Sequence, residues 1–185
     1  MSSLTVQNIQ GSASSSNTIN VASGHKISGA AGSIVAPGHV IQTTQQAYTT
    51  ATSISSTSYT ATGLSTSITP KFSSSKILVL VNLSAETYQQ GNSQPKFFIQ
   101  ILRNISGGSE TEIAFRRSDS YAGVASNGYY SFSVHGTMNY LDSPSTTNAV
   151  TYTVKGKLSS TANSSTFRLQ DASSMSTLTL QEIAQ

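Results

Sequence analysis

Apolar and polar residues alternate along much of the chain, and the longest apolar run spans residues 77–81 and resumes at Leu83. The run is short, rich in Val and Ile, preceded by serines and followed by charge at Glu86, which favours a strand over a helix. Alternation places the odd-numbered residues of the run on one face and Leu78 and Leu80 on the other. We therefore predict a central strand that is covered on both faces, so that loss of Leu80 is expected to be strongly destabilising.

Further alternating segments, bounded by Gly, Ser, Asn and Pro, predict an antiparallel arrangement of strands and no helix. They span residues 40–48, 57–64, 97–103, 111–115, 129–141, 149–157, 167–169 and 177–183. About eight short strands at this spacing are typical of an all-β protein, with an antiparallel β-sandwich or jelly-roll-like domain.

Alternation also predicts the direction of individual side chains. Tyr59, Ala61 and Leu64 are expected to point inward. The strand over residues 111–115 is expected to place the Phe115 ring on the face opposite Glu112. The run over residues 129–141 is expected to be a half-buried strand that bends at Gly136.

Residues 1–38 differ from the rest, because their apolar residues occur in small groups separated by Gly and Ser clusters, and residues 36–38 (Ala-Pro-Gly) form a boundary. Such a segment cannot form a core alone, so it is either a disordered linker or an extended arm that orders against a partner by strand addition. We predict an anchoring arm over residues 1–38 and a β-sandwich over residues 39–185. The candidate anchoring residues are Leu4, Val6, Ile9, Ile19, Val21 and Ile27.

The composition disfavours several classes of partner and chemistry. Only 9% of the 185 residues are charged and the net charge is +3, while Arg116 and Arg117 form the only adjacent basic pair, so nucleic-acid binding is not expected. The chain contains no Cys, which excludes disulfides and thiolate chemistry. It also has no signal-peptide pattern and no apolar run of membrane-spanning length, so we expect no membrane insertion.

Residues that carry catalytic chemistry are scarce. His25, His39 and His135 lie far apart without carboxylates at ligand spacing, so a metal site in a monomer is not expected, although His39 or His135 near a trimer axis would be presented three times. Glu110 and Glu112 could form a glycosidase-like pair, but the adjacent turn favours two solvated charges. We therefore predict no catalytic residues, no cofactor, no metal and no enzymatic activity.

Three tyrosines lie in or beside a Gly- and Ser-containing stretch, at Tyr121, Tyr129 and Tyr130. Aromatic rings in such a loop can stack on sugars or on a protein partner, which makes these residues candidate contacts. The alternative is that Tyr129 and Tyr130 simply begin a strand.

Several segments together resemble virion proteins of tailed bacteriophages, notably those of marine phages, and the similarity extends from about residue 34 to the C-terminus. The segments that carry it are residues 74–79 (Ser-Ser-Lys-Ile-Leu-Val), 139–144 (Asn-Tyr-Leu-Asp-Ser-Pro), 149–152 (Ala-Val-Thr-Tyr) and 178–183 (Leu-Thr-Leu-Gln-Glu-Ile). Their strand and turn motifs carry over no functional residue.

The resemblance implies a non-enzymatic virion structural protein, assembled in the cytoplasm of a bacterial host. It implies a homotrimer, either a tail or head fibre or a capsid decoration (cement) protein, whose arm binds capsid or tail proteins. The alternative from another class is a carbohydrate-binding receptor-recognition tip or a glycan-degrading tail protein that contacts a host-surface glycan.

Overall fold

The computed structural model describes residues 19, 21–29, 34–90, 96–119, 128–133 and 135–185. The chain divides into two units, Met1–Ile34 and Val35–Gln185, whereas the sequence pattern places the boundary at Gly38. The described residues of the first unit form no strand or helix. The second unit is an all-β sandwich, as the alternation predicts.

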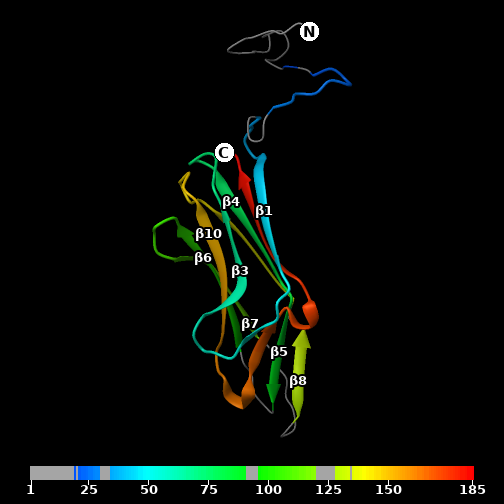
Figure 1. Ribbon diagram of the computed structural model, residues 1–185, viewed down its shortest axis with the longest axis vertical. Helices are drawn as coiled ribbons and strands as arrows, with labels where there is room; N and C mark the ends of the chain where they lie inside the picture. The colour runs from blue at the N-terminus through cyan, green and yellow to red at the C-terminus, as the bar shows by residue number, and fades with distance from the viewer. Residues whose placement is uncertain (1–18, 20, 30–33, 91–95, 120–127, 134) are drawn as a thin grey trace. The chain divides into compact units, whose positions relative to one another are not determined.

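Twelve strands form three four-stranded antiparallel sheets among the described residues (Figure 1). Sheet A has the order β1 (Val40–Tyr48), β12 (Ser176–Ile183), β4 (Lys76–Leu83) and β9 (Gly136–Asp142). Sheet B has the order β2 (Thr52–Ile54), β11 (Thr166–Leu169), β5 (Ala85–Gln90) and β8 (Tyr129–Ser133). Sheet C has the order β3 (Thr60–Ile68), β10 (Val150–Leu158), β6 (Lys96–Ile105) and β7 (Thr111–Asp119). Two 3₁₀ turns, η2 (Ala162–Ser164) and η3 (Asp171–Ser173), flank β11.

Sheets A and B are two halves of one long sheet that is broken by a crease. Their strand orders correspond one to one: β1 leads into β2, β11 into β12, β4 into β5, and β8 into β9. Between β4 and β5 the interruption is the single residue Ser84. In Figure 1, β5 and β8 accordingly lie beyond the end of β4. The sandwich therefore consists of this long, creased sheet and sheet C.

Side chains replace the interrupted backbone ladder at the crease. Gln170, at φ 55°, donates its backbone N–H to the carbonyl of Ser84 over 3.0 Å. The hydroxyl of Ser176 accepts from the N–H of Ser84 at 2.9 Å and from Nε2 of Gln170 at 2.8 Å. Gln170 and Ser176 are fully buried, so these bonds satisfy polar groups that would otherwise be costly inside the protein.

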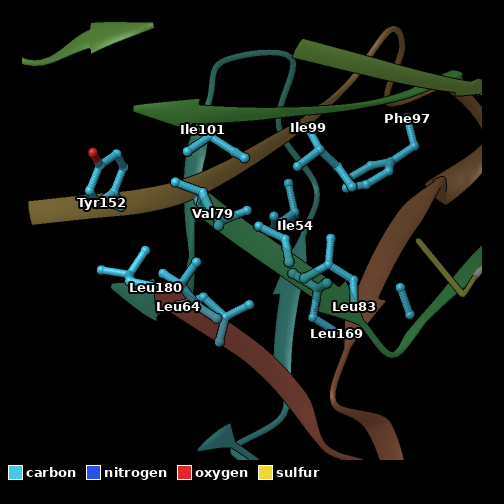
Figure 2. Packing of buried hydrophobic residues seen from close by; sticks show 14 of the residues in the cluster. Ile54, Leu64, Val79, Leu83, Phe97, Ile99, Ile101, Tyr152, Leu169 and Leu180 are labelled. Carbon is cyan, nitrogen blue, oxygen red and sulfur yellow. The ribbon is translucent and has the colours of Figure 1, made fainter. Parts of the chain in front are cut away.

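The core lies between the inner faces of the sheets (Figure 2). Strict alternation produces it: every second residue of β4, β10 and β12 is buried. Phe97 stacks on Phe167 between sheets B and C. Gly156 of β10 makes room for the Phe97 ring, because a Cβ at this position would lie 3.0 Å from two of its ring carbons.

The central strand meets the prediction on one face only. The side chains of Ile77, Val79, Val81 and Leu83 are buried, but Leu78 and Leu80 are half-buried on the outer face of sheet A. The prediction that this strand is covered on both faces is therefore wrong within one chain. Thr and Gln side chains of β12 flank these leucines instead of a second apolar layer.

Two further predictions of side-chain direction are reversed, for different reasons. Leu64 is buried as predicted, and Thr62, which shares its parity, is also buried and donates its hydroxyl proton to the Val154 carbonyl, so Tyr59 and Ala61 lie on the outer side. A shift between the β6 and β7 pairs turns Phe115 outward, with 51% of its surface exposed.

The long run over residues 129–141 is confirmed as strand, and the expected bend becomes a break. It passes from β8 in sheet B to β9 in sheet A, and β9 begins at Gly136.

We predict that Leu180→Ala lowers the free energy of unfolding by about 2–5 kcal/mol, because Leu180 is fully buried between the sheets and its truncation leaves a cavity. Leu80→Ala, the matched control on the outer face of the same sheet, is expected to cost about 1 kcal/mol or less in the monomer, because this side chain is only partly buried. Denaturant unfolding measures both. Equal losses would contradict the assignment of inner and outer faces.

Candidate interaction surfaces

A polar hollow of about 250 Å³ lies beside the crease. We call it the crease hollow. Glu86 comes from β5, Asp171 from η3, and His135 from the link between β8 and β9, and serines complete the wall. These side chains meet because each lies near the end of a strand that is interrupted at the crease.

Arg168 of β11 is the cation beside the hollow. It lies opposite Glu86 in the strand register, its guanidinium is 4.7 Å from the centre of the Tyr88 ring, and its Nη1 is 3.9 Å from Oδ2 of Asp171. The ion pair is exposed and long, so it contributes little stability. Both carboxylates can accept hydrogen bonds from a ligand.

The crease hollow does not have the ligands of a metal centre. Among the described residues, no group of three His, Cys, Asp or Glu side chains could hold a metal ion. Hydroxyls and carboxylates around a concave space suit a polyhydroxylated ligand, which donates hydrogen bonds to them.

A second candidate surface is the outer face of sheet C, where aromatic rings and lysines alternate across the strands. Nζ of Lys157 lies 4.5 Å from the centre of the Tyr59 ring and 5.5 Å from that of Phe98. The Phe98 ring stacks on Phe115 at a centroid distance of 5.8 Å. Burial and, to a smaller extent, the negative charge of Glu112 raise the pKa of Tyr59. We call this surface, formed by the rings of Tyr59, Phe98 and Phe115 and the cation of Lys157, the aromatic platform.

Glu110 and Glu112, considered above as a possible catalytic pair, lie just before and within β7. Oε2 of Glu110 accepts a hydrogen bond from Nζ of Lys155 at 2.7 Å. Glu112 is exposed on β7. Their arrangement is that of surface charges, one of them ion-paired.

A buried polar cluster between sheets A and C stabilises the sandwich. Oδ2 of Asp142 accepts a hydrogen bond from the Tyr152 hydroxyl at 2.7 Å, and Oδ1 accepts from Nη1 of Arg103 at 2.9 Å. Burial, and then the hydrogen bond to Asp142, raise the pKa of Tyr152 well above its ordinary value. The cluster is closed by its own partners, so it offers no group to a ligand.

The predicted tyrosine contacts fall only partly in the described structure. Tyr121 lies outside the described residues. The backbone of Tyr129 and Tyr130 begins β8, opposite Gln90 and Gln89 of β5, and their side chains lie outside the described part. Their role as contacts remains a prediction.

The predicted anchoring residues are also divided. Leu4, Val6 and Ile9 lie outside the described residues. The other three are exposed, with relative exposures of 52% for Ile19, 46% for Val21 and 66% for Ile27.

Sequence reasoning missed the residues of the crease hollow and of the aromatic platform. Glu86, His135 and Asp171 are far apart in the chain and no motif joins them. The platform was missed because a bulge in β7 turns Phe115 to the side opposite to the one that simple alternation gives, and because Tyr59 does not share the parity of the buried Leu64.

Comparison with known proteins identifies no family. The chain matches no protein-family model and no curated protein. A chain in the structure of infectious bursal disease virus, Gx strain, is 9% identical with a TM-score of 0.30, and the match covers 78% of this chain and 37% of that one. For the Gt strain the identity is 11%, the TM-score 0.29, and the coverage 79% and 39%. The chain thus spans well under half the length of these viral chains, and likenesses this weak carry no functional argument.

No helix in the described part of the chain has the length and apolar character needed to cross a membrane.

We predict that Tyr152→Phe lowers the free energy of unfolding by about 1–3 kcal/mol at neutral pH, because Asp142 loses a buried donor. The raised pKa means that the folded state holds the phenolic proton more tightly than the unfolded state. This contribution is complete below the ordinary value of 10.0 and is lost as the pH rises above it.

The wild-type protein should therefore lose more stability than Tyr152→Phe between about pH 9 and pH 11. Thermal melts over this range measure the difference, with Tyr140→Phe as an exposed control. Identical alkaline losses in the wild type and Tyr152→Phe would refute the role of the Tyr152 proton.

Proposed function

We propose that this chain is a non-enzymatic structural protein of a tailed-phage virion, in which the β-sandwich is displayed outward and the N-terminal segment attaches it to a capsid or tail protein. The resemblance of residues 34–185 to virion proteins of tailed phages supports a place in the virion. The observation that carries the attachment role is the exposure of Ile19, Val21 and Ile27 in a unit separate from the sandwich.

The physical argument concerns ordering. Fixing the backbone of one residue costs about 1–2 kcal/mol, and an extended segment without a core of its own cannot offset this cost. Apolar side chains such as Ile19 and Val21 offset it when a partner buries them, so the segment orders as it docks. A mere spacer would have no need of these side chains.

Self-association into a trimer belongs to the same proposal. The outer face of sheet A carries Leu78, Leu80 and Leu141, the last with 48% of its surface exposed. The cores of protein interfaces are depleted of charge, and the only charged residue on this face in the described strands is Lys76, at its end. A neighbouring copy, as in a fibre or a decoration trimer, would cover these leucines.

We predict that deletion of residues 1–32 leaves a soluble β-domain whose melting temperature is nearly unchanged, because the deleted residues precede the unit Val35–Gln185. The truncated protein should fail to join the particle. Copy number per purified particle, measured by quantitative mass spectrometry against the full-length chain, tests the attachment role. Incorporation at the wild-type level would contradict it and would make the sandwich the attachment surface.

The crease hollow favours a second candidate function, binding of a carbohydrate. Its carboxylates, serines and His135 form a concave polar wall of the kind that accepts sugar hydroxyls. The two functions are compatible, because a displayed sandwich can carry a receptor site.

On a glycan array, we predict that any glycan retained by the wild type at the crease hollow is lost by Glu86→Gln and by Asp171→Asn. Lys155→Gln on sheet C is the control and should not alter retention. Purified protein should leave polysaccharides and peptidoglycan intact, as expected of a non-enzymatic structural protein. Turnover that Glu86→Gln abolishes would replace the structural role with an enzymatic one.

A further inference from the structure

The edges of the sheets differ in how they are protected. Unpaired strand edges invite other strands, and proteins commonly block them with charges, prolines, bulges or covering groups. On one side of the sandwich, side chains of β1 cover the backbone of β3 and of Thr69, the residue that follows it. Nε2 of Gln42 donates to the Thr69 carbonyl at 2.7 Å, and Oε1 of Gln46 accepts from the N–H of Ser65 at 2.7 Å.

The edge strand β7 of sheet C has its own protection. It carries Arg116 and Arg117, and a register shift interrupts its pairing with β6 between Ile101 and Leu102. Charge and irregularity at the same edge disfavour the addition of another strand.

The edge strand β9 of sheet A is covered at its start, where Nη1 of Arg116 in β7 donates to the Thr137 carbonyl, and it has fewer of these features beyond that residue. It contains no Lys, Arg or Pro, and its pairing with β4 runs without a register shift from Asp142 to Gly136. Its one charged residue, Asp142, is buried and bound to Arg103 and Tyr152. Beyond Thr137, β9 is thus regular and carries no exposed charged side chain of its own.

The direction in which the backbone groups of β9 point follows from the pairing of β4 with its two neighbours. Ser84, just after β4, bonds toward β12 through Ser176, so alternation turns Leu83 and Val81 of β4 toward β9. Their partners Gly136 and Met138 must then bond back to β4.

The intervening residues of β9 point their N–H and C=O groups away from the sheet. Arg116 confirms this direction, because its Nη1 donates to the outward carbonyl of Thr137. Asn139 and Leu141 share the parity of Thr137, so their backbone groups face outward as well.

Side chains on both faces of this edge could pack against an added strand. Leu141 lies opposite Leu78 on the outer face of sheet A and is 48% exposed. Tyr140 lies on the other face and is 39% exposed. A strand placed beside β9 would therefore gain backbone hydrogen bonds and apolar contacts together.

We propose that the β9 edge is a strand-addition site for a second copy of this chain, which contributes residues 18–21 (Thr-Ile-Asn-Val) of its N-terminal segment. The segment is uncharged like β9, and Ile19 and Val21 have the two-residue spacing of one strand face. In the described structure these two side chains are 52% and 46% exposed.

Reach and surface both favour a second copy as the donor. The 18 residues from Val21 to His39 span up to about 60 Å when extended, which is enough to reach a neighbouring copy. One four-residue segment cannot also cover Leu78 and Leu80, whereas the body of a neighbouring copy can. The inference rests on the self-association in the proposed function and assigns the contact that makes it. Ile19 and Val21 then bind the neighbouring copy, while Ile27 and the residues before Thr18 are left to attach the chain to a capsid or tail protein.

Engineered cysteines give a direct test, because the natural chain has none. Full-length Val21→Cys and full-length Asn139→Cys are mixed, dissociated, reassembled and oxidised. We expect a disulfide-linked pair of one chain of each variant, identified by mass spectrometry after tryptic digestion. In the double variant, a link confined to one chain would show that each segment binds its own β9, and would overturn the exchange between copies.

A proline variant tests the backbone contact. Asn139→Pro removes an outward N–H and leaves the bonds to β4 intact, and proline is tolerated at such an edge. We expect Asn139→Pro to fall to the mass of one chain, 19.4 kDa, in light scattering at a concentration where Asn139→Ala remains assembled. Circular dichroism should show that both variants are folded.

The outcomes separate this inference from the proposed function. If Asn139→Pro assembles as the wild type does and no mixed disulfide forms, the β9 inference fails while self-association stands. If only Asn139→Cys chains link to one another, β9 pairs with its own copy across a two-fold axis instead. If the wild type is itself a single chain at all concentrations, self-association fails, and the inference fails with it.

Discussion

The interaction on which the sandwich depends is the contact between the inner row of β4 and the side chains of sheet C that face it. Val79 and its neighbours along β4 are buried on one side only, and Figure 2 shows Val79 between Leu180 of β12 and Ile101 of β6. This packing fixes which face of β12 and β9 is internal, since a slip of one residue would exchange the faces of a strand. The polar cluster at Asp142 and Tyr152 then adds a directional contact to a non-directional apolar layer.

The crease is a second consequence of the same long sheet. Four strand pairs are interrupted along one line, and the fold retains its regular order on both sides because the side chains of Gln170 and Ser176 take over the missing backbone contacts. The space at the interruption is the crease hollow, which has a polar wall and opens to solvent, and it is not an empty cavity in the apolar core. Polar side chains thus gather where the ladder is interrupted, although no sequence motif joins them.

The fold class could be predicted because its cause is local. Alternating apolar residues in β4, β10 and β12 mark the buried face directly, and the strand bounds of β1 agree with the pattern. The errors have two causes. Tyr59 was assigned to the wrong side because it does not share the parity of Leu64, which is buried. Phe115 was assigned to the wrong side because one extra residue in β7 changes the parity, and this shift depends on pairing between distant strands. The crease hollow could not be predicted for the same reason, as its residues meet only after sheets A and B have formed.

The two outer faces of the sandwich differ in charge, and this difference favours different neighbours. The outer face of sheet C presents Lys155, Lys157 and glutamates around aromatic rings, groups that remain well solvated or bind a charged partner. The outer face of sheet A presents Thr, Gln and Asn around half-buried leucines. Burying this second face removes almost no charge from water, so the desolvation cost is low. A contact between identical copies also brings like surfaces together, where repeated charges would repel. The uncharged face therefore suits self-assembly better than the charged face of sheet C does.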